Sequence, residues 1–196
     1  MPAKRLDAEP LASSDEKGAR WKVDGKSTVE RVRRKGRCGK GRRRRVGDAS
    51  PGGARVRAME VEGGWLLRLE VGEKLPASLA TFCKEKGIAT ATADGLGALE
   101  DVVLGYYDVV TKVYHKTELA GSWELLSLFA DVAEWQGDLF AHMHVVISGR
   151  DCVARGGHLF EGTVSVTAEI RVWTIAKPVR RVLDPAIGLH LLDLPR

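Results

Sequence analysis

The sequence predicts an α+β fold over residues 59–176, with a mainly antiparallel sheet and one or two packed helices. One early segment, after Pro76, has apolar residues at helical spacing, whereas the segments that follow are strand-like and joined by short turns. The longest of these, Thr163–Ile175, alternates between apolar and polar residues from Thr163 to Val172. Short connections favour antiparallel pairing because parallel neighbours need long crossovers, so one helix followed by many strands indicates this class.

Each expected element rests on a local pattern. Trp65–Val71 is an apolar, strand-like run, and the segment from Pro76 to Gly87 combines helical spacing with a helix-starting proline and a helix-ending glycine. Ile88–Thr92 is β-branched, and we expect it to end in a turn at Asp94–Gly97. Further strands are expected at Val102–Tyr107, Val109–His115, Ser122–Phe129, Phe140–Ile147 and Thr163–Ile175.

The formal net charge of +5 divides unevenly along the chain. Residues 1–58 hold 18 basic and 7 acidic residues, whereas residues 59–196 hold 13 basic and 19 acidic ones. Because residues 59–196 are acidic, the whole chain is not one basic nucleic-acid-binding domain. Because residues 1–58 carry few large apolar side chains, we expect a disordered basic tail there, followed by a domain at 59–176 and a C-terminal extension at 177–196.

The positive charge of the tail is concentrated in residues 31–45, of which ten are basic. Side chains at this density neutralise phosphates and give salt-sensitive DNA affinity. Lys35-Gly36-Arg37 is similar to the core of an AT-hook, although Cys38 stands where that motif continues with proline. The candidate DNA-binding residues are Arg33, Arg34, Lys35, Gly36, Arg37, Lys40, Arg42, Arg43, Arg44 and Arg45.

Two other interpretations of the tail stay open. It is a generic basic arm, or it is a translated leader upstream of a true start at Met59, which directly precedes the first patterned segment. The sequence contains no apolar run of the roughly 18 residues that a membrane helix needs, and no secretory signal. Three widely spaced cysteines indicate a reducing compartment, so we expect a cytoplasmic protein, nucleoid-associated in a prokaryote or nuclear in a eukaryote.

Several short motifs occur in a characteristic order. They are Ala93-Asp94-Gly95-Leu96-Gly97-Ala98-Leu99, Trp123-Glu124-Leu125-Leu126-Ser127-Leu128, His142-Met143-His144, Gly156-Gly157-His158-Leu159, Gly162 and Thr167-Ala168-Glu169. In this order they resemble the plants-and-prokaryotes-conserved (PPC) domain, also called DUF296, over about residues 64–176. Two departures from the family pattern are Asp151-Cys152, where a turn glycine is usual, and Ala130, where glycine often follows the Ser-Leu strand.

The resemblance implies an α+β domain with an antiparallel sheet that assembles as a homotrimer in stand-alone prokaryotic members. Such domains accompany AT-hooks in plant nuclear proteins, and prokaryotic relatives are commonly labelled as DNA-binding. The family resemblance therefore implies DNA as a partner, but the residue pattern of the domain does not itself show DNA binding.

Three histidines form a candidate metal site. His142 and His144 lie two apart in a strand-like segment and so project from one face, with Cβ atoms roughly 6.5–7 Å apart. His158 follows a Gly156-Gly157 pair whose backbone freedom can bring its ring close to the other two. Three neutral imidazoles with an open fourth position suit Zn²⁺ or another divalent ion. Glu124 and Glu169 are candidate carboxylates for the metal or its ligands, and the alternative is that each histidine is an ordinary polar residue.

No catalytic residue is assigned from the sequence, which lacks a nucleophile elbow, a P-loop and a dinucleotide fingerprint. The first functional hypothesis is a trimeric DNA-binding protein, nucleoid-associated or regulatory, with an AT-hook-like tail, and this hypothesis favours a protein that is not an enzyme. The alternative is a metal-binding trimer or a metal-dependent enzyme that acts on an unknown small molecule. A purely structural or protein-interaction role is the third.

Overall fold

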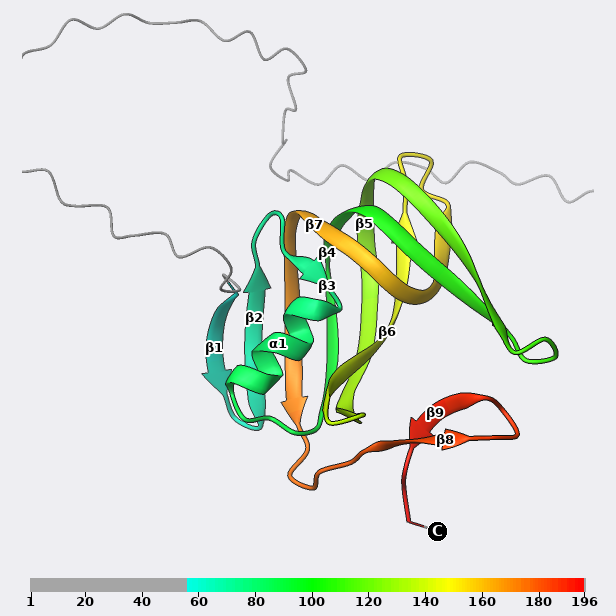
Figure 1. Ribbon diagram of the computed structural model, residues 1–196. Helices are drawn as coiled ribbons and strands as arrows, with labels where there is room; N and C mark the ends of the chain where they lie inside the picture. The colour runs from blue at the N-terminus through cyan, green and yellow to red at the C-terminus, as the bar shows by residue number, and fades with distance from the viewer. Residues whose placement is uncertain (1–55, 196) are drawn as a thin grey trace, which may run out of the picture. The chain divides into compact units, whose positions relative to one another are not determined.

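The computed structural model describes residues 56–195, so residues 1–55 of the expected tail, with all its candidate DNA-binding residues, lie outside the described residues. Within that region the chain forms one helix and nine strands (Figure 1). In chain order these are β1 (Arg57–Val61), β2 (Gly64–Leu69), β3 (Lys74–Leu75), α1 (Ala77–Glu85), β4 (Ala91–Asp108), β5 (Val113–Trp135), β6 (Asp138–Ser148), β7 (Ala154–Thr174), β8 (Arg181–Asp184) and β9 (Leu189–Leu192).

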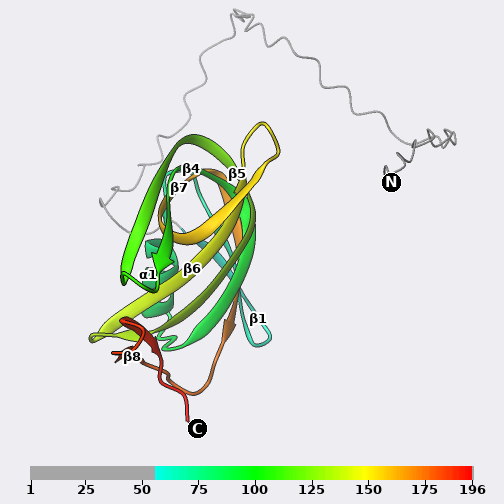
Figure 2. The same cartoon turned by 90° about the vertical axis from the view of Figure 1, so that its right-hand side faces the viewer.

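Strands β1 to β7 form one antiparallel sheet in the order β1-β2-β7-β4-β5-β6, with the short β3 paired to β7. The sheet closes on itself, because β6 pairs with β5 along one edge and with the start of β7 along the other. Figure 2 shows the long strands curving around this closure. The expected antiparallel sheet with a short helix is confirmed, although strands dominate the described region so strongly that the label α+β fits only loosely.

The helix α1 matches the expected segment between Pro76 and Gly87. Its apolar residues Leu79, Phe82 and Cys83 are buried, and Gly87 ends it in the left-handed region at φ 66°. Phe82 meets the Trp65 ring edge-on at 5.5 Å between centroids. The helix therefore covers one face of the sheet, as Figure 1 shows.

Two expected connections were wrong. The chain does not turn at Asp94–Gly97, because β4 continues through it with register shifts after Gly95 and Glu100. A Cβ atom on Gly95 would lie 2.5 Å from the Glu169 carbonyl oxygen, so glycine serves close strand packing here. The strand expected at Val109–His115 begins only at Val113, since the preceding residues form the β4–β5 turn.

The inward and outward faces of β6 follow from its alternation. Ala141, Met143, Val145 and Ile147 are buried in the core. The intervening residues, which include His142 and His144, therefore lie on the outer face of the sheet. No helix of the region 56–195 is long and apolar enough to cross a membrane.

The extension after residue 176 folds into the β8–β9 hairpin and contacts the tip of the β4–β5 hairpin. Tyr107 Oη donates a hydrogen bond to the Ile187 carbonyl at 2.8 Å, and Lys112 Nζ donates one to the Pro185 carbonyl at 2.9 Å. The extension therefore belongs to the same folded body as the sheet.

At the other end of the domain, β1 begins at Arg57, two residues before the expected boundary.

Candidate metal centre

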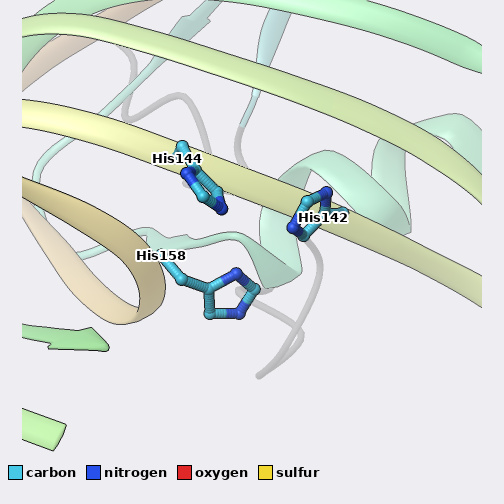
Figure 3. Close-up of side chains that lie close together, drawn as sticks. All are labelled: His142, His144 and His158. Atoms are coloured by element: carbon cyan, nitrogen blue, oxygen red, sulfur yellow. The ribbon is translucent and has the colours of Figure 1, made fainter. Parts of the chain in front are cut away.

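His142 and His144 on β6 and His158 on β7 converge on the outer face of the sheet, as Figure 3 shows. One ring nitrogen from each residue lies within 4.8 Å of those of the other two. The ring centroids are 5.0 Å apart for His142 and His144, 5.2 Å for His142 and His158, and 5.5 Å for His144 and His158. The structure thus brings the three predicted residues together.

The convergence follows from strand register. His144 pairs directly with His158 across β6 and β7, and strand alternation puts His142 on the same face. Gly156 and Gly157 contribute in a different way from the one expected, since neither lies in the left-handed region. A Cβ atom on Gly156 would lie 2.8 Å from the Val145 oxygen and one on Gly157 2.9 Å from the Gly105 oxygen, so these glycines let β7 approach its neighbours closely.

Burial favours the neutral form of two of the three histidines, His144 and His158. Burial lowers the pKa of His158 to about 4, with a smaller contribution from the neighbouring His142. Burial and His142 also lower the pKa of His144 below its ordinary value. Neutral imidazoles keep the lone pairs that a metal ion requires.

The donor set fits a divalent metal ion. His158 Nδ1 is buried and has no hydrogen-bond partner among the described residues, and a metal ion would satisfy it. In a tetrahedral zinc site, with Zn–N bonds of about 2.0–2.1 Å, ligand nitrogens lie about 3.4 Å apart, so binding needs small rotations of these rings. His144 is exposed and His142 half-buried, which leaves one side of the cluster open.

Asp131 on β5 is the carboxylate that lies beside the cluster. Its Oδ2 is 3.4 Å from His142 Nδ1, and its Oδ1 accepts a hydrogen bond from Arg181 Nη2. Burial raises the pKa of Asp131, but the hydrogen bond with His142 and the charge of Arg181 more than offset this, so that pKa lies below its ordinary value. Asp131 therefore orients His142 with Nδ1 toward the carboxylate and Nε2 free for a metal ion.

Sequence reasoning named Glu124 and Glu169 instead, and the structure places both elsewhere. Glu124 pairs with Ser148, four residues along β6 from His144. Glu169 is exposed on β7 opposite Arg68 and Leu96. The proximity of Asp131 to His142 could have been predicted from Gln136-Gly137. A two-residue hairpin turn at these positions pairs His142 with Asp131 across β5 and β6.

Two hollows flank the histidines. An open depression of about 480 Å³ lies on the exposed side and includes Asp94, Phe129 and His144 in its lining. A second cavity, of about 330 Å³, adjoins His142 and His158 beneath the C-terminal hairpin. His190 lines this cavity, and its ring centroid lies 5.5 Å from that of Trp135.

The turn between β6 and β7 contains Asp151-Cys152, where the family pattern usually has a glycine. Cys152 has φ 57°, in the left-handed region that favours glycine. The side chain is exposed and lies outside the histidine cluster.

Comparisons with known proteins agree with the fold. The model of the Plants and Prokaryotes Conserved (PCC) domain matches residues 57–176. A plant- and prokaryote-conserved (PPC) protein from Pyrococcus horikoshii is 32% identical over 74% of this chain and 99% of its own, with a TM-score of 0.64. A metal-containing protein from Archaeoglobus fulgidus is 33% identical over 73% of this chain and 99% of its own, with a TM-score of 0.63.

A third similar structure, from Ralstonia eutropha, is described as a "putative DNA-binding protein". It is 25% identical over 70% of this chain and 96% of its own, with a TM-score of 0.67. No curated protein matches the chain. The family match over the whole sheet, with the close likeness of the Pyrococcus and Archaeoglobus proteins, establishes that the chain belongs to the Plants and Prokaryotes Conserved domain family.

Proposed function

We propose that this protein binds Zn²⁺ or another divalent metal ion at His142, His144 and His158 and presents it to a small molecule. The observation that carries the proposal is the approach of three ring nitrogens within 4.8 Å of one another. The similarity to a metal-containing protein from Archaeoglobus fulgidus supports it. A bound Zn²⁺ with three imidazole ligands supplies a Lewis acid with one open position.

The surroundings favour a functional ion over a structural one. Structural zinc sites close with four protein ligands, whereas this cluster has three histidines, and the nearby Asp131 already bonds His142 and Arg181. The exposed edge of His144 and the adjoining hollows give a small molecule access to the ion. A metal-dependent reaction on that molecule is the corresponding enzymatic alternative.

Metal analysis of the full chain tests the proposal. After zinc loading and desalting, we expect about one zinc per chain, and loss of that zinc in a variant carrying both His142→Ala and His158→Ala. His115→Ala is the matched control, because His115 is exposed and lies outside the cluster. Absence of zinc from the wild type, or equal zinc in the double variant, would overturn the proposal.

We also propose that the domain forms a homotrimer, as the family resemblance implies. The support is a groove on the outer face of the sheet that combines exposed apolar side chains with the Asp94–Arg171 ion pair. Leu96, Leu126 and Phe129 line this groove and are 56%, 52% and 66% exposed. Exposed apolar residues grouped in this way are typical of protein interfaces.

DNA association through the basic tail is the second candidate function. Its support is the run of ten basic residues at 31–45 and the description of the Ralstonia relative. Three arms on one trimer would raise DNA affinity through effective concentration, while the net charge of −6 over 59–196 opposes contact by the body. Such binding would place the protein at the nucleoid of a prokaryote or in the nucleus of a eukaryote.

The test is duplex binding by the full chain at several salt concentrations. Replacing Arg42, Arg43, Arg44 and Arg45 with glutamine should weaken binding and flatten its salt dependence. Lys177→Gln, an exposed substitution in the body, is the control. Binding that is unchanged by the four substitutions would contradict a tail-borne interaction.

A further inference from the structure

The cavity beneath the C-terminal hairpin has mostly apolar walls. It has a volume of about 330 Å³ and lies between the outer face of the sheet and β8–β9. Its aromatic wall comprises Tyr114, Trp135, Phe140 and Phe160, and Leu189 and Leu191 of β9 complete its apolar lining. A volume near the lower end of the range of about 300–1,000 Å³ seen for small-molecule sites fits a ligand with a single ring.

Two buried donors belong to side chains that line this cavity. The Arg181 side chain is only 7% exposed, and it bonds Asp131 through Nη2 and the His190 carbonyl through Nη1. Its Nε is buried and has no partner in the described structure, and the same is true of Trp135 Nε1. Buried polar groups are normally hydrogen-bonded, and both of these atoms are donors, so the missing partner is an acceptor.

The charges around the cavity favour an anion. Arg181 is balanced by Asp131, and the adjoining His142 and His158 belong to the cluster proposed to bind a divalent cation. With that cation bound, the region carries net positive charge. The aromatic walls disfavour a small, strongly hydrated anion, because its hydration shell would be lost without replacement.

We propose that this cavity binds a small carboxylate with an aromatic or other apolar body. The apolar body lies among the aromatic rings and β9 leucines, and a carboxylate oxygen accepts a hydrogen bond from Arg181 Nε or Trp135 Nε1. The preference for an anion rests on the proposed metal site. The cavity and its two unpaired donors are present in the structure whether or not a metal ion binds. Arg181, Leu189 and Leu191 lie beyond the matched family region 57–176, so this specificity comes from the chain's own extension.

Calorimetric titration of the full chain with benzoate tests the proposal, with the protein zinc-loaded and metal-free. Acetate serves as the carboxylate without a ring, and benzyl alcohol as the ring without a carboxylate. We expect benzoate to bind at least tenfold more tightly than either, and more tightly still to the zinc-loaded protein. Equal or absent binding of all three would overturn the proposal.

Two variants locate the site. Leu189→Trp fills the cavity and should abolish benzoate binding, whereas Leu183→Trp, on an exposed position of the same hairpin that does not line the cavity, should leave it unchanged. Trp135→Phe keeps an aromatic ring but removes the Nε1 donor, and should weaken benzoate more than benzyl alcohol. Benzoate binding that survives Leu189→Trp would overturn the assignment.

The zinc content of the same samples separates this proposal from the metal proposal. A protein that takes up zinc on its histidines but does not bind benzoate overturns the carboxylate site and leaves the metal site standing. A protein that binds benzoate in this cavity but takes up no zinc supports the cavity and overturns the metal site.

Discussion

Asp131 on β5 lies beside His142 on β6, with 3.4 Å between the carboxylate Oδ2 and the ring Nδ1. The other carboxylate oxygen accepts a hydrogen bond from Arg181, so the C-terminal hairpin is connected to the histidine cluster through one side chain. A carboxylate on the far nitrogen of a ligand histidine fixes its tautomer and increases its basicity. The orientation of His142 therefore depends on a residue of the hairpin.

Replacing Asp131 with asparagine is predicted to weaken zinc binding. The variant removes the charged acceptor from His142, and loss of such a partner typically lowers metal affinity about 10- to 100-fold. Competition with a chromogenic zinc chelator measures the affinity. Asp138→Asn, which removes an exposed carboxylate bonded to Lys84, is the matched control and should not change it.

Introducing charge at Phe129 is predicted to break the trimer. Phe129→Glu replaces an exposed apolar side chain of the groove on the outer face of the sheet with a carboxylate, whose burial against another subunit would cost free energy. Light scattering after size exclusion should show a trimeric mass for the wild type and a smaller mass for the variant. Val110→Glu, on the exposed β4–β5 turn, controls for a general effect of charge. A wild type that runs as a monomer would contradict the proposed assembly.

Gly157→Ala is predicted to destabilise the fold and displace His158. The added methyl group would lie 2.9 Å from the Gly105 carbonyl oxygen, a contact that requires β7 to move away from β4. We expect a loss of about 1–3 kcal/mol in the free energy of unfolding, as for other overpacked sites, together with weaker zinc binding. Urea unfolding and the chelator assay measure the two effects. Gly149→Ala, whose nearest neighbour is a Trp123 side-chain atom, should cost less.

The two cysteines of the described region should differ sharply in reactivity. Burial raises the pKa of the Cys83 thiol to about 11, so its reactive thiolate stays scarce until the pH approaches that value. Cys152 is exposed. Iodoacetamide at pH 8 should therefore modify Cys152 and spare Cys83 in the native protein, whereas denaturant should expose both. Peptide mass spectrometry reads out each site, and fast native labelling of Cys83 would contradict its buried position.

Cys152→Gly is predicted to stabilise the protein. A non-glycine residue in the left-handed region carries a conformational cost of about 1–2 kcal/mol, which glycine relieves at the expense of greater freedom in the unfolded chain. Because these effects oppose each other, we expect a net gain of about 0.5–1 kcal/mol in unfolding free energy. Thermal unfolding measures the stability of Cys152→Gly against that of Cys152→Ala, which keeps a Cβ atom and should not gain stability.

Much of the fold could be predicted because its signals are local. The helix at Ala77–Glu85 and the antiparallel strands follow from apolar periodicity within each segment. The continuity of β4 could not be predicted, because Gly95 and Gly97 are typical of a turn. In the structure these glycines instead allow β7 to lie close to β4. The extended conformation at Gly95–Gly97 depends on contacts with a distant strand, which the local sequence does not encode.

The candidate site divides in the same way. The His142 and His144 pair follows from strand alternation, whereas the approach of His158 depends on the β6–β7 register. Asp131 could have been found from the hairpin turn at Gln136-Gly137. The role of Arg181 could not, since its contact with Asp131 spans fifty positions and depends on where the C-terminal hairpin packs.

X-ray absorption at the zinc edge, on the zinc-loaded full chain, shows whether the three histidines hold a divalent metal ion. We expect three imidazole nitrogens at about 2.0–2.1 Å with one additional light ligand, and loss of the imidazole signal in the variant carrying both His142→Ala and His158→Ala. A spectrum with sulfur ligands, with fewer than two imidazoles, or unchanged in the double variant would contradict the proposed metal site.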